Sequence, residues 1–253
     1  MGTAAFLCLY AVIVFGSSAV GALAAFGGAL LALPPLAWLS GDLRLAVITL
    51  LLLGFVGGVQ LAVAPVRHVQ WRPLGGLLGW TAATVPIGLL MATSLPQGPM
   101  MIALGVTTLV GGVSGFSAGL PQVASRPFRL VDRFLLLAAG VMHGAFGCGG
   151  GPVVLAARHA VPAKESFRGT LFVFWLFLNS LTLAGFAASP SPWAQALLLT
   201  AVGLPCMIAG NYVGQRLARR ISQRLFGAIL AALLAVTGIV TIVRYAPALW
   251  SAS

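Results

Sequence analysis

Two glycine-rich clusters are the segments of this sequence best suited to bind a ligand. One is Gly-Cys-Gly-Gly-Gly-Pro at 147–152, and a weaker counterpart is Ala-Phe-Gly-Gly-Ala at 25–29. Each interrupts an apolar stretch, and the helix is expected to unwind there, because an interior glycine costs about 1 kcal/mol and proline lacks an N–H. Unwinding leaves free N–H groups at the positive end of the returning helix, and glycine lets a ligand approach them closely. The clusters therefore predict an anion site built largely of backbone, although close helix packing is the alternative use of such glycines.

Three side chains near the clusters are further candidates. His143 is either a satisfied interior donor or a group that contacts the anion or carries a transported proton, since imidazole changes charge near neutral pH. Cys148 is either a small apolar filler or a contact through its neutral thiol. Asn179 either bonds a neighbouring helix or faces the ligand, and the same choice applies to Gln60 and Asn211. The predicted substrate-binding residues are Gly27, Gly28, Gly147, Cys148, Gly149, Gly150, Gly151, His143 and Asn179.

Other kinds of chemistry find little support in the sequence. Its three acidic residues, Asp42, Asp132 and Glu165, fall in loops or helix starts, so a cation site or a carboxylate proton relay within the membrane is not expected. The three cysteines show no paired spacing, which disfavours a disulfide framework and a zinc site. We find no phosphate-binding loop, no nucleophile with a nearby base and no paired carboxylates. The sequence therefore predicts neither an enzyme nor a cofactor or metal site.

Composition identifies the environment in which these residues act. The formal charge is +11, yet only 7% of the 253 residues are charged and 60% are hydrophobic. A soluble domain averages about 25% charged residues, so a nucleic-acid-binding globule is excluded despite the positive charge. The chain is predicted to be an integral membrane protein surrounded by lipid.

Apolar runs of about 20 residues mark the helices that must position the clusters. Two further regions, 4–39 and 134–161, contain the clusters and are predicted to be broken helical hairpins. The clusters lie 122 positions apart, which indicates an internal repeat. The first repeat covers 1–117, a cytoplasmic linker covers 118–133, and the second repeat covers 134–253. The six ordinary helices are predicted at 45–64, 74–91, 100–117, 172–188, 193–213 and 225–243.

The distribution of Lys and Arg favours a particular topology. Single crossings by both broken regions would place six cations on one face and eight on the other, whereas hairpins that enter and leave on one side place twelve against two. Membrane proteins normally carry such a bias on the cytoplasmic face, so both termini are predicted to be periplasmic. Two full crossings per hairpin would give the same parity. The predicted fold is an all-α polytopic membrane protein of two inverted repeats, each a broken or re-entrant hairpin followed by three transmembrane helices.

The two clusters and the three-helix unit after each resemble the sulfite exporter TauE/SafE family. The residues that carry this resemblance are the cluster at 147–151, its weaker echo at 25–29 and the Leu-Leu-Ala-Leu-Pro-Pro-Leu segment at 30–36. The resemblance covers nearly the whole chain and implies export of sulfite or small organosulfonates across the bacterial inner membrane. Ala25 and Ala29 stand where the family has its outer glycines, so the first break is expected to be tighter.

The leading functional hypothesis is a secondary transporter that exports a small sulfur-containing anion by alternating access around the facing breaks. Its partners would be the anion, the lipid bilayer and a coupled proton or other ion. An anion channel is the main alternative, and a membrane assembly factor or an intramembrane enzyme fits the residues less well. Arg158 and Arg168, at the cytoplasmic side of the second hairpin, are either membrane-surface anchors or groups that attract anions to the inner mouth. The sequence carries no signal for an oligomeric state.

Overall fold

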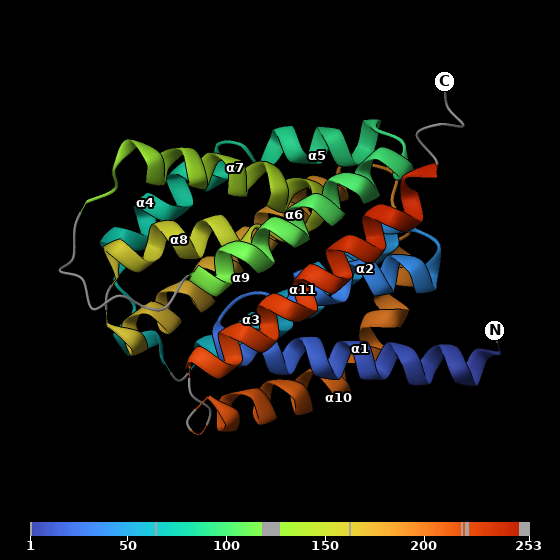
Figure 1. The fold of residues 1–253 in the computed structure, drawn as a ribbon, viewed down its shortest axis with the longest axis horizontal. Helices are drawn as coiled ribbons and strands as arrows, with labels where there is room; N and C mark the ends of the chain where they lie inside the picture. Colours follow the sequence, from blue (N-terminus) through green and yellow to red (C-terminus); the bar gives the residue numbers. More distant parts are fainter. Residues whose placement is uncertain are drawn as a thin grey trace.

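The computed structural model describes residues 2–63, 65–117, 127–161, 163–218, 220 and 223–247, and across these residues the secondary structure is entirely helical (Figure 1). The all-α class predicted from the sequence is confirmed. Part of the predicted linker, 118–126, lies outside the described residues. The helices are α1 (Thr3–Ala24), α2 (Gly28–Ser40), α3 (Leu43–Ala62), the 3-10 turn η1 (Pro65–His68), α4 (Trp71–Ala82), α5 (Val85–Ser94), α6 (Gln97–Ser117), α7 (Leu130–Phe146), α8 (Gly150–Ala160), α9 (Lys164–Ala187), α10 (Trp193–Leu217) and α11 (Gln223–Tyr245).

Both glycine clusters interrupt helices, with Ala25–Gly27 between α1 and α2 and Gly147–Gly149 between α7 and α8. Each hairpin joins a long arm to a short one. At about 1.5 Å per residue, the 22 residues of α1 reach about 33 Å, enough to cross a hydrocarbon core of about 30 Å, whereas the 13 residues of α2 do not. The arms of the second hairpin are also unequal, but both are shorter than the hydrocarbon core: α7, with 17 residues, reaches about 26 Å, and α8, with 11, about 17 Å. Each hairpin therefore combines a longer entering arm with a shorter return.

Some helix bounds differ from the sequence-based expectation. The helix predicted at 74–91 is divided into α4 and α5, because Pro86 has no N–H to offer the carbonyl of Ala82, where α4 ends. The helix predicted from 172 begins at Lys164, since its first two turns are polar and lie outside an apolar window. The second hairpin begins at Leu130 because the Asp132 carboxylate accepts a 2.8 Å hydrogen bond from the backbone N–H of Arg129.

Apolar helices confirm a multi-pass membrane protein. Within the described residues, 5 helical segments are long and apolar enough to cross a bilayer: Thr3–Ala24, Leu43–Ala62, Trp71–Ser94, Glu165–Ala187 and Trp193–Leu217. The segment Trp71–Ser94 combines α4 and α5. Shorter apolar helices are Gly28–Ser40, Gln97–Val110 and Ala231–Tyr245.

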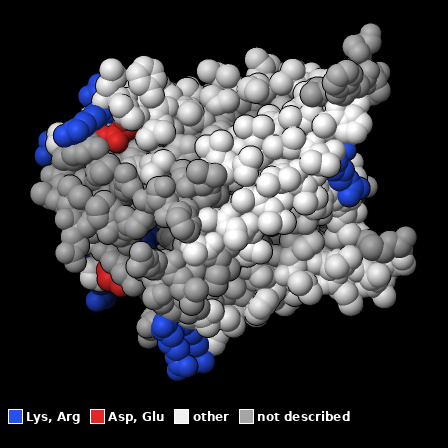
Figure 2. Space-filling view, in the orientation of Figure 1, with Lys and Arg blue, Asp and Glu red and all other residues white. Residues whose placement is uncertain are grey.

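The two ends of the helical bundle differ in charge. The chain termini lie at the same end (Figure 1), and most of the visible Lys and Arg gather at the opposite end (Figure 2). At the end with the termini, the Arg44 guanidinium donates hydrogen bonds to the carbonyls of Pro190, Ala92 and Thr93, at 3.0, 3.1 and 3.3 Å. Arg44 thus ties the start of α3 to the last turn of α5 and to the loop that follows α9.

Helix pairs join the two halves of the chain. α1 packs along α10, α7 packs along α4 and α5, α3 packs on α9, and α6 packs on α11. Small residues let the backbones touch in the first two pairs. A Cβ at Gly214 would collide with the carbonyl of Ala19 in α1, and one at Gly144 would collide with the carbonyl of Val85 in α5. The entering arm of each hairpin is therefore clamped to a helix of the other half.

Candidate functional site

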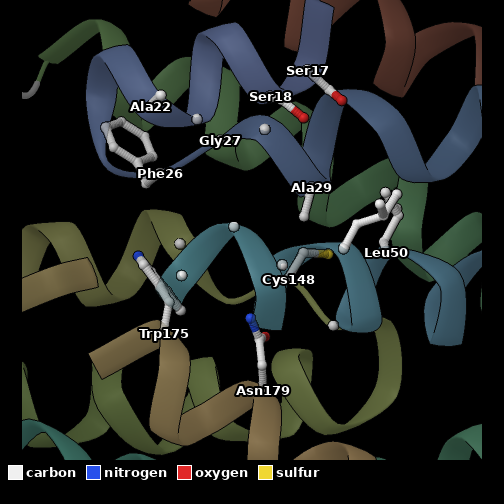
Figure 3. A pocket seen from close by; sticks show the side chains of 18 of the residues that line it. Ser17, Ser18, Ala22, Phe26, Gly27, Ala29, Leu50, Cys148, Trp175 and Asn179 are labelled. Carbon is white, nitrogen blue, oxygen red and sulfur yellow. The ribbon is translucent and has the colours of Figure 1, made fainter. Parts of the chain in front are cut away.

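A pocket of about 170 Å³ lies where the two breaks meet, between α1, α3, α9 and α10. One water needs roughly 10–15 Å³ by the same measure, so the pocket has room for a small hydrated ion. Figure 3 shows Ser17, Ser18 and Phe26 on one side and Trp175 and Asn179 of α9 on the other. Of the nine residues predicted to bind substrate, eight line the pocket: Gly27, Gly28, His143, Gly147, Cys148, Gly149, Gly150 and Asn179.

Gly151 is the predicted residue that is absent from the pocket lining. It belongs to the first turn of α8, where successive residues point about 100° apart around the helix axis. Consecutive glycines in a helix therefore cannot all face one ligand. Gly150, the residue before Gly151, does line the pocket.

The two breaks begin in the same backbone conformation and contact each other, although they end differently, with φ 86° at Gly27 and −123° at Gly149. Ala25, with φ 64° and ψ 12°, and Gly147, with φ 66° and ψ 16°, end α1 and α7 in the same left-handed conformation. A Cβ placed on Gly150 would lie 3.3 Å from the Cβ of Phe26 and 3.6 Å from the backbone nitrogen of Gly27. The start of α8 thus rests directly on the first break.

Both returning helices begin without a side-chain cap. The residues before them, Gly27 and Gly149, have no side chain to accept a hydrogen bond from the first turn. The first N–H groups of a helix have no partner within the helix, and Gly28, Ala29 and Gly150 line the pocket. The pocket wall therefore contains the positive ends of two helices.

His143 is a buried polar side chain of the pocket lining, beside the amide of Asn179. It is 1% exposed, and neither Nδ1 nor Nε2 makes a hydrogen bond of normal distance and angle. Its ring stacks on Trp175 with centroids 5.8 Å apart and an interplanar angle of 24°. A buried imidazole with unpartnered nitrogens normally loses free energy, so a bound polar ligand would supply what the protein does not.

Asn179 reaches the pocket because α3 has a glycine opposite it. A Cβ at Gly54 would lie 2.8 Å from Nδ2 of Asn179, so any larger residue there would push the amide away. Asn211 also lines the pocket, and its Nδ2 donates to Oε1 of Gln60 at 2.9 Å. Gln60 is not a lining residue, and it orients Asn211 rather than facing the cavity.

Several lining residues are not among the sequence-based candidates. Ser17 and Ser18 of α1 border the pocket, as do Phe172 and Trp175 of α9. Two adjacent serines inside an otherwise apolar stretch are a signal that the sequence does contain. Nothing in the local sequence of α9 distinguishes Trp175 from the other aromatic residues around it.

Arg168 turns toward the first break. Its two terminal nitrogens donate to the carbonyls of Ala22, at 2.8 Å, and Leu23, at 3.4 Å. Trp175 Nε1 donates to the carbonyl of Ala25 at 2.8 Å. The side chain of Arg158, the other candidate cation, lies outside what the structure describes.

A second pocket, of about 410 Å³, opens at the end that carries the termini and is bordered by Arg44, Val47 and Ala145 among others. Val47 borders this second pocket, and Gly147 borders the first. A Cβ at Gly147 would lie 3.1 Å from Cδ2 of Leu51 and 3.7 Å from Cγ1 of Val47. One turn of α3 and the end of α7 therefore form the barrier between the two cavities.

No metal site emerges within the described part of the chain, where no three His, Cys, Asp or Glu side chains gather closely enough to hold an ion. The lining of the first pocket likewise includes no carboxylate.

The chain matches the model of a known protein family. A family model described as Sulfite exporter TauE/SafE matches residues 9–241. No curated protein and no solved structure gives a significant match.

Proposed function

The chain belongs to the sulfite exporter TauE/SafE family, and we propose that it is a secondary transporter that binds sulfite or a small organosulfonate between its two helix breaks. Membership makes it a membrane transporter for a small sulfur-containing anion rather than an enzyme. The proposal adds the place of binding and the way in which the anion moves.

One observation is the main support for the proposed location of the binding site. His143, buried with both nitrogens unpartnered, lies in the same pocket as the uncapped first turns of α2 and α8. N–H groups at helix starts favour anions, and no carboxylate among the lining residues opposes them. Asn179 and the serines of α1 add neutral hydrogen-bonding groups, which suits an oxyanion with several acceptors.

The two halves are proposed to be inverted repeats. The matched conformations of Ala25 and Gly147 support this, and so do the helix pairs, because α1 with α10 is the counterpart of α7 with α4 and α5 under exchange of the halves. The positive-inside rule makes the cation-rich end cytoplasmic. The protein would then lie in the bacterial inner membrane with both termini in the periplasm.

Alternating access would require the layer around Val47, Leu51 and Gly147 to part, so that the first pocket communicates with the second. Facing broken helices at the interface of repeats are the usual setting for such a change. A coupled proton, if the transport uses one, has His143 as its nearest carrier in the pocket.

The test is counterflow of labelled sulfite in proteoliposomes, with sulfate, thiosulfate, sulfoacetate and chloride as competitors. Saturable exchange that is inhibited by sulfur oxyanions more than by chloride is expected. Current without counterflow would instead identify a channel, and the absence of any sulfite flux would refute the proposal.

A matched pair of glycine variants tests the location of the site. Gly150→Leu would push a side chain into Phe26 and the pocket, and exchange should be lost. At Gly16, in α1, an added Cβ would meet no atom within 4 Å, so Gly16→Leu should exchange normally. Both proteins should insert and purify alike, and normal exchange by folded Gly150→Leu would place the anion elsewhere.

A further inference from the structure

A helix break brings together two ends of opposite polarity. At the first break the last carbonyls of α1, which form the negative end of its dipole, lie next to the first N–H groups of α2. Ala22 and Ala25 line the same pocket as Gly28 and Ala29. An anion drawn to the N–H groups would therefore also meet the carbonyls, and the two effects would partly cancel.

Two side chains of α9 cover these carbonyls. The guanidinium of Arg168 donates to Ala22 and Leu23, and the indole of Trp175 donates to Ala25. The guanidinium lies 5.7 Å from the centre of the Phe172 ring, which itself borders the pocket. The positive charge of Arg168 thus lies near the proposed anion site, although Arg168 is not a lining residue of the pocket.

The second break has no equivalent groups in its partner helix. With the 122-residue offset that relates the breaks, Arg168 corresponds to Ala46 and Trp175 to Leu53 of α3. Neither of these apolar side chains can donate a hydrogen bond. At this break the backbone N–H of Gly147 bonds the carbonyl of His143 at 2.7 Å.

We propose that Arg168, assisted by Trp175, is a positioning residue that masks the carbonyl end of α1, so that the first break presents chiefly N–H groups and positive potential to the anion. The inference rests on the proposed function, because it assumes that the anion binds between the breaks. It assigns Arg168 a role that a membrane-surface anchor would not have, since an anchor extends its charge into the interfacial water.

Three substitutions separate charge from hydrogen bonding. Arg168→Gln removes the charge and keeps a donor, Arg168→Lys keeps the charge but not the planar fork, and Trp175→Phe keeps an aromatic ring without its N–H. The readout is the KM for labelled sulfite in counterflow, separately from the maximal rate. Arg216→Gln is the matched control, since that arginine lies in the last turn of α10 and stacks on Tyr212 at 4.3 Å.

Arg168→Gln should raise the sulfite KM about tenfold, because it removes the charged hydrogen bonds to the carbonyls at the end of α1. The maximal rate should change much less. Arg168→Lys should recover most of the affinity, Trp175→Phe should raise the KM by about threefold, and Arg216→Gln should match the unmodified protein.

The outcomes of these measurements distinguish the masking role of Arg168 from a purely structural role and from failure of the proposed function. An unchanged KM in folded Arg168→Gln, with sulfite exchange intact, would overturn the masking role and leave the proposed function standing. Loss of protein yield with an unchanged KM in the surviving fraction would identify Arg168 as structural and would also overturn it. If Arg168→Gln does not fold, a KM raised in Trp175→Phe and near normal in Arg168→Lys supports the masking role, and an unchanged KM in Trp175→Phe rejects it. Absence of sulfite exchange in the unmodified protein would instead refute the proposed function.

Discussion

The two breaks begin with the same left-handed residue conformation but have different surroundings. The first begins at Ala25, a non-glycine residue in the left-handed region, and is held by hydrogen bonds from Arg168 and Trp175. The second begins at Gly147, which tolerates the same conformation without side-chain support. A left-handed helix end has therefore been stabilised in two ways, by external donors in one half and by glycine in the other.

The polar groups of the pocket are distributed just as unequally. At the 122-residue offset, His143 corresponds to Gly21 and Asn179 to Gly57. The second half thus supplies the imidazole and the amide, while the glycines of α3 leave room for the amides of Asn179 and Asn211. If the halves are the repeats proposed above, a symmetric frame holds an asymmetric site, and the following experiments test this difference.

The largest effect, a loss of stability, is expected at Gly28 and Gly149, where the two arms of each hairpin are in backbone contact. A Cβ at Gly28 would collide with the carbonyl of Ser17, and one at Gly149 with the carbonyl of Ala139, so Gly28→Ala and Gly149→Ala should each cost about 3 kcal/mol. Yield and monodispersity in detergent measure this, with Gly16→Ala as the control. If only one of the two proteins fails to fold, the hairpins are not equivalent in packing.

The next largest effect is a loss of sulfite affinity at His143, and it tests whether the two halves contribute unequally to binding. His143→Ala should raise the sulfite KM about tenfold to a hundredfold, because it removes the unpartnered buried group that faces the pocket. Gly21→Ala, at the equivalent position, places its Cβ in ordinary contact 3.6 Å from Gly28 and should bind sulfite normally. Counterflow measures both, and equal losses of affinity would argue for a symmetric site.

A smaller loss of sulfite affinity is expected when the side-chain amide of Asn179 is removed or displaced. Asn179→Ala should raise the KM about fivefold, and Gly54→Ala should do the same by displacing Nδ2 of Asn179. Since both changes act on one group, the double variant should be no worse than either single variant. Additive losses would show that Gly54 acts independently of the amide.

Changes at the turns themselves should alter stability by less than the cost of about 3 kcal/mol expected at Gly28 and Gly149. Ala25→Gly should stabilise the protein by about 1 kcal/mol, because it removes the cost of a left-handed alanine. Gly147→Ala should destabilise it by about 1–2 kcal/mol, since φ is +66° and the new Cβ would press on Leu51. Thermal unfolding in detergent gives both values, and changes of the same sign would contradict the comparison.

The positions of the breaks could be predicted because glycine and proline act locally. The unwound segments at 25–27 and 147–149 depend on the cost of these residues within a few positions along the chain. The end of α4 at Ala82 follows from Pro86 by the same logic and could have been anticipated.

Contacts between distant segments could not be read from the sequence. The role of Arg168 depends on which helix end lies beside α9, and nothing in its neighbours distinguishes a bond to Ala22 from an exposed surface anchor. The placement of Asn179 likewise depends on a glycine 125 positions earlier, Gly54, which the fold brings opposite it. Such features require the tertiary arrangement.

The clamping of α1 to α10 also affects how the protein is made. Tyr10 donates a 2.6 Å hydrogen bond to the carbonyl of Leu199, 189 residues later. During synthesis from the N-terminus, the first arm of the first hairpin therefore enters the bilayer long before the helix that holds it exists. Assembly of the first half therefore has to wait until α10 has been synthesised and inserted.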